Sequence, residues 1–330
     1  MERVTKKKIV SSIKIAFGVV LVTLSIWYCG RMLLSNWHEI QQHPISFRPG
    51  FIGPALGCMA LHFFILSLGW QALTHTFRCG LPLKTSVPLW FITYLGRYIP
   101  GKVLFITGRI MAYTSLGTRL GPTTYATILD NIFHIYAAVV VGAGTLVWVP
   151  GLPFLVKVGL VSCAAGLSVI MLNPYLCNYI LKKAAVSRGQ MVADVHVPVT
   201  FPTLIGLTLV YLSSYIPLAL GLYFFSQCFE HIPFSHSSWL AGCLGCALAG
   251  GILAVITPSG LGVREGIFTW LLQFVINPDI AAVFAIATRV MMTIAELLCA
   301  GIAMILLFMQ HKSLGLITRA TKDRPIKNEC

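Results

Sequence analysis

Charged residues are scarce in this sequence, and acidic residues are the scarcest. Of 330 residues only 10% are charged, with 10 Asp and Glu against 24 Lys and Arg. Ordinary soluble domains carry about 25% charged residues, so a surface this poor in charge could not stay dispersed in water. Hydrophobic residues make up 57% of the chain. The composition therefore excludes a soluble domain and indicates an all-α polytopic membrane protein.

Several chemical signatures are missing as well. No Walker A sequence is present, so ATP is not expected to be the direct energy source. Cys243 and Cys246 form an isolated C-x-x-C pair inside an apolar run, and no second pair or His cluster completes a zinc site. No nucleophile–base constellation is visible, and the first apolar run lacks a small-residue cleavage site. We expect no metal, no cofactor, no catalytic residue and no cleavable signal.

The formal net charge of +14 would suggest a nucleic-acid binder in a soluble protein. Here the Lys and Arg residues lie mainly in short segments between apolar runs, as in cytoplasmic loops. We therefore expect no nucleic-acid partner. The sequence predicts a multi-pass protein of the cell (inner) membrane.

Apolar runs long enough to cross a bilayer as helices, which takes about 20 residues, occur six times. They are residues 13–34, 51–73, 122–148, 152–172, 201–226 and 280–309. Two further apolar stretches, 86–120 and 239–278, are interrupted by Pro and Gly. Counting each of these as one broken element gives about eight transmembrane elements.

Basic residues fix the expected orientation, because they gather in cytoplasmic segments. They are frequent at both ends of the chain, so both termini are expected in the cytoplasm. Stretch 86–120 then begins and ends on the cytoplasmic side, and stretch 239–278 begins and ends outside. Each must be a hairpin, either a re-entrant loop or two short helices that meet at a break.

The two halves of the chain have matching organisation. Residues 1–150 and residues 151–330 each hold three full spans and one hairpin, and an odd number of spans makes the second repeat inverted relative to the first. The breaks fall at 99–102 and 257–262. Paired interruptions in inverted repeats point to a transporter's binding site near the middle of the membrane. Two unrelated kinked helices are the alternative, because Pro and Gly are common in membrane helices.

Five ionisable residues lie inside apolar runs, where each costs about 2.5–3.5 kcal/mol on insertion scales. They are Asp130, Arg264, Glu265, Arg289 and Glu296. In one account the pairs Arg289–Glu296 or Arg264–Asp130 hold the bundle together. In the other, the arginines bind an anion and the carboxylates position or release it.

Cationic residues also crowd the two breaks, which favours an anion site. Broken helices expose backbone N–H groups, Arg grips phosphate oxygens with two hydrogen bonds, and Gly permits close approach. The predicted substrate-binding residues are Arg97, Pro100, Gly101, Lys102, Arg109, Pro258, Gly260, Gly262, Arg264 and Arg289. The predicted charge-pairing or coupling residues are Asp130, Glu265 and Glu296.

Two local spacings predict contacts rather than chemistry. Gly242, Cys246 and Gly250 recur every four residues, which indicates close helix packing. Asp130 and His134 are four apart and share one face of their helix.

The sequence around the two breaks resembles a known family. YLGRYIPGK at 94–102, followed by Gly108 and Arg109, is similar to the first signature of the lysylphosphatidylglycerol synthase transmembrane family. PSGLGVREG at 258–266 resembles its second signature, and Arg289 falls where that family carries a further Arg. The family includes the flippase half of the multiple peptide resistance factor, so the resemblance implies lipid handling.

There are two departures from the family pattern. Asp130 stands where the family often has Glu. The chain also ends about twenty residues beyond the last predicted span, so we expect the soluble aminoacyl-transferase half to be missing and only the flippase-like half to remain.

The leading hypothesis is a flippase that moves a phosphate-bearing lipid or lipid-linked sugar between leaflets, rather than an enzyme. One alternative is an intramembrane glycosyltransferase-type enzyme acting on polyprenyl-phosphate substrates, although Glu230 and Asp279 have no convincing partner. The other is a non-transporting accessory subunit of a lipid-modifying enzyme. The expected partners are an anionic lipid or lipid-linked glycan head group, a lipid-modifying enzyme encoded elsewhere, and a second copy of the chain.

Overall fold

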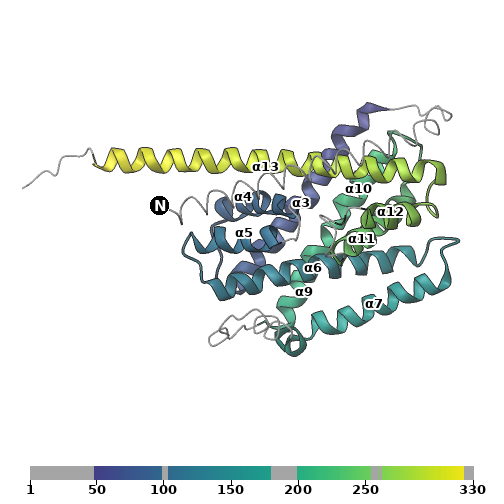
Figure 1. Cartoon of the computed structure of the whole chain (residues 1–330), viewed down its shortest axis with the longest axis horizontal. Helices are drawn as coiled ribbons and strands as arrows, with labels where there is room; N and C mark the ends of the chain where they lie inside the picture. The colour runs from purple at the N-terminus through teal and green to yellow at the C-terminus, as the bar shows by residue number, and fades with distance from the viewer. Residues whose placement is uncertain (1–47, 99–102, 180–198, 254–259, 261, 323–330) are drawn as a thin grey trace, which may run out of the picture.

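Every secondary-structure element in the described part of the chain is a helix (Figure 1). The computed structural model describes residues 48–98, 103–179, 199–253, 260 and 262–322. Six segments in these ranges are long and apolar enough to cross a membrane: Pro49–Thr76, Leu120–Leu146, Phe154–Leu172, Phe201–Ser226, Phe234–Leu253 and Ile280–Gln310. The chain is an all-α polytopic membrane protein, as its composition predicts.

Five of the six predicted full spans correspond to observed helical segments, and the remaining one, 13–34, lies outside the described residues. Three of them are single helices, α3, α6 and α7; a fourth is the membrane-length part of α13. The helices are α3 (Ile52–Thr76), α6 (Leu120–Leu146), α7 (Phe154–Leu172) and α13 (Pro278–Lys322). The sixth observed segment, Phe234–Leu253, comes from the interrupted stretch 239–278.

The fifth predicted span, 201–226, is made of two helices rather than one. They are α9 (Phe201–Ser213) and α10 (Tyr215–Ser226), separated at Ser214. Pro217 lies in the first turn of α10 and cannot donate a backbone hydrogen bond to the preceding turn. The break therefore falls where the sequence removes a helical donor.

Helix α13 is longer than the sequence pattern predicts. The predicted span 280–309 matches the membrane-length segment Ile280–Gln310, but the helix itself continues to Lys322 and contains 45 residues. At 1.5 Å per residue it is roughly 65–70 Å long, about twice the thickness of the hydrocarbon core. In Figure 1 one end of α13 projects well beyond the bundle. The first proline after it is Pro325, so nothing in the sequence stops the helix at the membrane surface.

The first interrupted stretch forms two short helices on either side of its break. They are α4 (Leu83–Tyr94), continued by the 3-10 turn η2 (Leu95–Tyr98), and α5 (Val103–Thr114). A helix of 12 residues is about 18 Å long, too short for a hydrocarbon core of about 30 Å. The two helices pack against each other. The predicted site residues Pro100, Gly101 and Lys102 lie outside the described residues.

The second interrupted stretch has a similar layout. Helix α11 (Ser237–Leu253), preceded by the 3-10 turn η3 (Phe234–His236), packs against the shorter α12 (Val263–Leu272). Pro258 lies outside the described residues. Gly260 and Gly262 adopt φ values of +72° and +80°, in the left-handed region that favours glycine.

Gly260 also packs directly against Gly251 of α11. A Cβ atom added at Gly260 would lie 2.6 Å from the Cα of Gly251. Two glycines in contact allow the backbones to approach more closely than any side chain permits. The sequence analysis assigned Gly260 to anion approach, and the structure gives it a packing role that needs no ligand.

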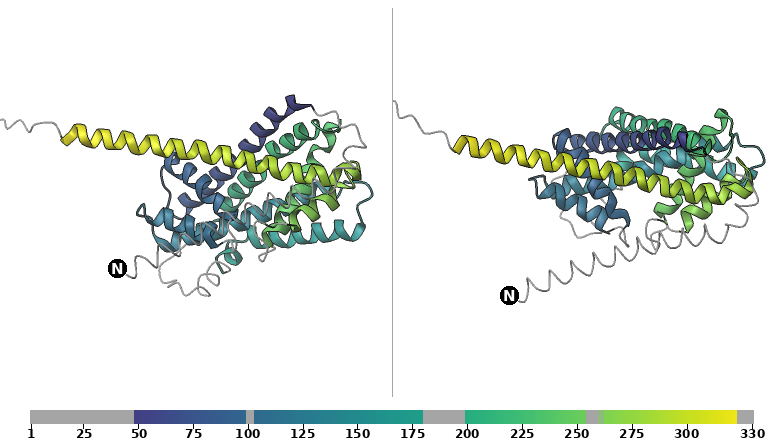
Figure 2. Two further views of the ribbon diagram at one scale, coloured as in Figure 1. Left: turned by 45° about the horizontal axis from the view of Figure 1, so that its top comes forward. Right: turned by 90° about the horizontal axis from the view of Figure 1, so that it is seen from above.

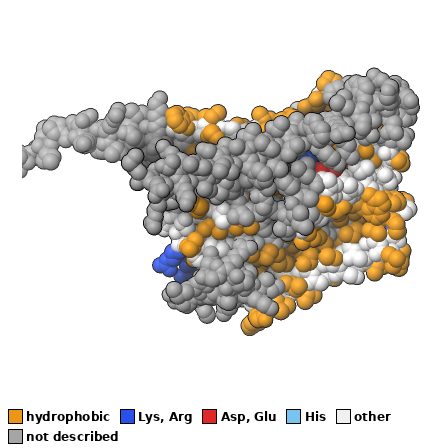
Figure 3. All heavy atoms as spheres, viewed as in Figure 1, with side chains coloured by type: hydrophobic (Ala, Val, Ile, Leu, Met, Phe, Trp, Pro, Cys, Tyr) orange, Lys and Arg blue, Asp and Glu red, His pale blue; other side chains and the backbone are white. Residues whose placement is uncertain are grey.

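The helices pack side by side in one bundle. Helices α3 and α10 lie side by side, α11 packs on α6, and α13 crosses α4 and α12 (Figures 1 and 2). Helix α7 packs on α6 and leaves most of its surface exposed, with Phe154 and Leu155 more than 75% exposed. In Figure 3 many hydrophobic side chains lie at the surface in the lower right, the part of the view where Figure 1 draws α7. Exposed apolar surface of this extent is suited to lipid.

Close packing of α11 accounts for the predicted small-residue pattern, since Gly242 and Cys246 face α6 and Gly250 faces Ile267 of α12. Gly242 contacts Thr145, and Cys246 contacts Gly142, so the two backbones approach along this face. Gly245, one residue before Cys246, has the tightest backbone contact. A Cβ atom there would lie 3.0 Å from the carbonyl oxygen of Ala138.

We expect Gly245→Leu to destabilise the bundle, because the added side chain would push α11 away from a backbone carbonyl that cannot rotate aside. Overpacking of this kind costs about 1–3 kcal/mol or more. Gly144→Leu on α6 is the matched control, since a Cβ atom there meets nothing within 4 Å. Thermal unfolding in detergent should show a lower Tm for the first variant only. Equal Tm values for both variants would contradict this packing.

Candidate functional site

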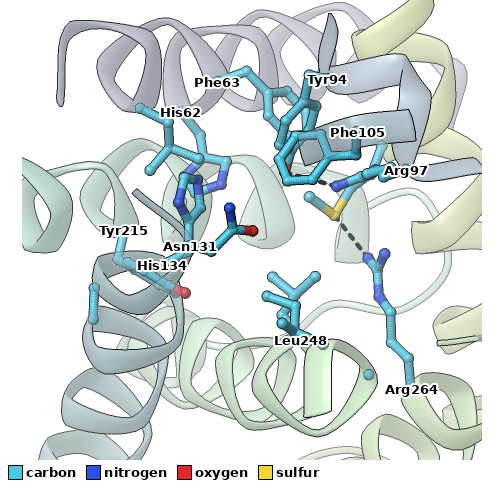
Figure 4. A pocket seen from close by; sticks show the side chains of 15 residues that line it. His62, Phe63, Tyr94, Arg97, Phe105, Asn131, His134, Tyr215, Leu248 and Arg264 are labelled. Atoms are coloured by element: carbon cyan, nitrogen blue, oxygen red, sulfur yellow. Dashed lines mark hydrogen bonds between the residues drawn. The ribbon is translucent and has the colours of Figure 1, made fainter. Parts of the chain in front are cut away.

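A small cavity lies where the first and second halves of the chain meet. It is enclosed by residues from α3, α6, α10, α11, α12 and α13 and from the α4–η2–α5 segment, and has a volume of about 90 Å³. This is enough for about six water-sized groups. Its polar lining consists of His62, Arg97, Asn131, His134 and Arg264, and the remaining wall is aromatic and aliphatic (Figure 4). Two of the predicted anion-binding arginines therefore meet at one cavity.

Arg264 is the cation at this cavity that has no carboxylate partner in the described part of the chain. It is the second residue of α12, directly after the Gly262 turn, and only 5% of its surface is exposed. Its Nη2 donates to the Met292 sulfur at 3.1 Å, and a thioether is a weak acceptor. A buried guanidinium without a counter-ion is costly. The arrangement favours an anion beside Arg264.

Arg97, at the end of η2, is the second cation at the cavity, and its charge is balanced. Its guanidinium forms an ion pair with Glu296 of α13 and donates to the Tyr94 hydroxyl at 2.7 Å. The Tyr98 hydroxyl donates to the other Glu296 oxygen, also at 2.7 Å. An anion entering the cavity would compete with Glu296 for Arg97.

Arg109 does not line the cavity and is fully buried beside it. Its Nη1 donates to Asp130 at 2.5 Å, and both side chains are 0% exposed. The Tyr211 hydroxyl donates to the second Asp130 oxygen. The guanidinium lies 4.7 Å from the centre of the Trp70 ring and 4.8 Å from that of Phe105, both favourable cation–π distances. This packing suits a residue that joins α5 to α6.

Arg289 also lies away from the cavity lining. It forms an ion pair with Glu265, and both residues are about 95% buried. The other Glu265 oxygen accepts a 2.8 Å hydrogen bond from the Gly262 backbone N–H. Glu265 thus caps the first turn of α12 and ties that turn to α13. The pair fixes the helix end that carries Arg264.

Neither of the two ion pairs considered in the sequence analysis, Arg289–Glu296 and Arg264–Asp130, is formed. Arg289 and Glu296 are seven residues apart, which places them about 10 Å apart along one helix, and each meets a partner from another segment. Arg264 does not pair with Asp130, because Arg109 and Tyr211 occupy both carboxylate oxygens. The predicted common face of Asp130 and His134 is confirmed by a 3.6 Å separation.

His62 and Asn131 are cavity residues that the sequence analysis missed. A histidine within an apolar span is itself unusual, so His62 could have been found on that ground. Asn131 follows Asp130 and precedes His134 by three residues, so all three share one side of α6. The spacing along α6 could have grouped Asn131 with Asp130 and His134. It could not have shown that α3 brings His62 to the same cavity.

We expect Arg289→Gln to lower thermal stability sharply, because it leaves Glu265 as an unpaired buried charge. Removing one member of such a pair costs about 3–5 kcal/mol. The double variant with Glu265→Gln should recover much of the loss, since neither charge then remains. Thermal unfolding of both single variants and the double variant measures the coupling. Strictly additive losses would show that the two side chains do not interact.

Comparison with known families agrees with the resemblance at the breaks. A family model described as the lysylphosphatidylglycerol synthase TM region matches residues 13–300, which include both breaks and Arg97, Arg109, Arg264 and Arg289. A search of curated proteins found no match. Since the family match extends over most of the chain, this protein belongs to the lysylphosphatidylglycerol synthase transmembrane-region family.

Proposed function

We propose that this protein moves a phosphate-bearing lipid, or a lipid-linked sugar, between the two leaflets of the cell membrane. The observation that carries the proposal is Arg264, a buried guanidinium at the cavity with no carboxylate partner among the described residues. A phosphate would supply the missing negative charge and accept two hydrogen bonds from the planar guanidinium. Membership of the family supports a role in lipid handling.

The cavity offers a head group a polar environment within an apolar region. A charged group in hydrocarbon is strongly disfavoured, whereas Arg264 and Arg97 present two guanidinium groups to this cavity. Arg97 can release Glu296 when a phosphate approaches, and Glu296 can reclaim Arg97 when the phosphate leaves. The exchange keeps Arg97 paired before and after the lipid passes.

Transport without bond cleavage suits the state of the buried carboxylates. Asp130, Glu265 and Glu296 are each engaged by an arginine. A general acid or base needs a carboxylate that is free to exchange a proton with substrate. The pairings therefore favour a carrier over an enzyme.

The proposed architecture has two inverted repeats, residues 1–150 and 151–330, each with one hairpin. Helices α4 and α5 pack together and are individually too short to cross the membrane, which suits a re-entrant hairpin. Helices α11 and α12 also pack together, and α12 has only 10 residues. Arg97 and Arg264 lie beside the two breaks, so the hairpins would bring both arginines to the cavity.

We expect both termini in the cytoplasm, and two contacts support this orientation. Gln310 donates to the Lys84 carbonyl at 3.1 Å, joining two segments rich in basic residues. The Arg48 backbone N–H donates to the Cys228 carbonyl at 3.1 Å, joining two segments assigned to the outside. In a background without other reactive cysteines, Lys84→Cys should react with an impermeant maleimide from the cytoplasm and His231→Cys from outside. Labelling of both positions from one side would contradict this topology.

The proposed function is tested by Arg264→Gln and Arg264→Lys in proteoliposomes that contain only this chain. The assay follows the leaflet position of fluorescent acyl-labelled phosphatidylglycerol. Loss of a charge-assisted, two-pronged contact is worth about 1.5–3 kcal/mol, so Arg264→Gln should slow transport by about tenfold to a hundredfold. Arg264→Lys keeps the charge but loses the planar fork, so it should be intermediate.

Arg119→Gln is the matched control, because Arg119 is exposed and is not one of the residues that line the cavity. We expect it to transport at the normal rate. Both Arg264 variants should keep the thermal stability of the parent protein, since no ion pair is broken. Full transport by stable Arg264→Gln would refute the proposal.

A further inference from the structure

Arg264 reaches the cavity through a side chain that is held at both ends. A Cβ atom added at Gly251 of α11 would lie 3.2 Å from the Cβ of Arg264, so the stem of the arginine packs against the backbone of α11. At the other end, Nη2 donates to the Met292 sulfur of α13 at 3.1 Å, the contact that a dashed line marks beside Arg264 in Figure 4. Two helices therefore orient the guanidinium.

The contact with Met292 is polar rather than simple packing. Met292 is 1% exposed and belongs to the cavity lining. Heavy atoms that only pack against each other lie about 3.5–4.0 Å apart, and the nitrogen and sulfur are closer than that. A thioether carries no charge and accepts only weakly. The sulfur can thus orient Arg264, but it leaves the positive charge unneutralised.

The other arginine of the cavity provides a comparison on the same helix. Met292 and Glu296 are four residues apart on α13 and share one face of it. Glu296 meets Arg97 in an ion pair, whereas Met292 meets Arg264 with a neutral sulfur. Met and Glu side chains have similar lengths, so a carboxylate could reach Arg264 from the position of Met292. Helix α13 therefore places a carboxylate beside one arginine and a thioether beside the other.

We propose that Met292 is a positioning residue for transport, which orients the Arg264 guanidinium at the cavity without neutralising it. The inference rests on the proposed function, because it concerns how the cation for the phosphate is kept available. A carboxylate at this position would stabilise the buried cation but compete with the incoming anion. An aliphatic side chain would leave the guanidinium freer to rotate, and ordering it would then weaken binding. The thioether avoids both effects.

Met292→Glu tests whether the free charge is needed. The new carboxylate would pair with Arg264, so the Tm in detergent should rise by about 2 °C or more. Transport of acyl-labelled phosphatidylglycerol in proteoliposomes should slow by about tenfold to a hundredfold, since the phosphate must displace a charged hydrogen-bond partner. Met291→Glu is the matched control. Met291 is 5% exposed, and no arginine donates to it among the described residues, so this variant should lower the Tm.

Met292→Leu and Met292→Gln separate the acceptor from packing. Leu has nearly the same volume but no acceptor, so the phosphatidylglycerol mole fraction at half-maximal rate (KM) should rise by about twofold to fivefold, with a smaller change in maximal rate and Tm. Met291→Leu should leave KM unchanged. Gln supplies a neutral acceptor, so Met292→Gln should stay closer to the parental KM than Met292→Leu. If Met292→Glu does not fold, this comparison decides alone.

The outcomes distinguish the role of Met292 from the transport function itself. A parental KM in folded Met292→Leu, or undiminished transport by folded Met292→Glu, would overturn the positioning role and leave the proposed function standing. Absence of phosphatidylglycerol transport by the parent protein would overturn the proposed function, and the positioning role with it.

Discussion

A guanidinium within an apolar bundle is costly unless negative charge lies beside it, and this constraint organises the described centre of the protein. Arg97, Arg109 and Arg289 each meet a carboxylate from another segment. Each pair joins two elements: η2 to α13, α5 to α6, and α13 to α12. Within the membrane the backbone hydrogen bonds are already used inside the helices, so they cannot join one helix to another. The ion pairs therefore act as cross-links between helices.

Arg264 differs from these three because no carboxylate in the described part of the chain forms an ion pair with it. The pair Arg289–Glu265 holds the start of α12, and Glu265 also receives the Gly262 N–H. Arg264 is consequently fixed at the cavity by its neighbour's interactions rather than by its own ion pair. A cation held in place without an internal carboxylate partner is well suited to bind an anionic group and to release it again. The incoming anion does not have to displace a carboxylate first.

The polar residues that line the cavity come from several different helices. Arg97 and Arg264, the two residues beside the breaks, line one part of it, and His62 of α3 lines another together with Asn131 and His134 of α6. The kink at Ser214 places a carbonyl where His62 can donate to it, so the interruption between α9 and α10 helps to set the tautomer of a residue on another helix. Small residues on α11 let that helix approach α6, and Leu248, Gly251 and Ile252 farther along α11 line the cavity.

The sequence by itself determined the membrane class, most span positions, the two interrupted stretches and the set of buried charges. These follow from hydrophobicity and from one-dimensional spacing, which depend only on neighbouring residues. Tertiary structure alone decided which charges pair, because partners such as Arg97 and Glu296 lie 199 residues apart. It also decided that Arg109 and Arg289 lie away from the cavity lining and that His62 belongs to it. Side-chain proximity between helices depends on their rotation and crossing, and helical periodicity contains no information about either.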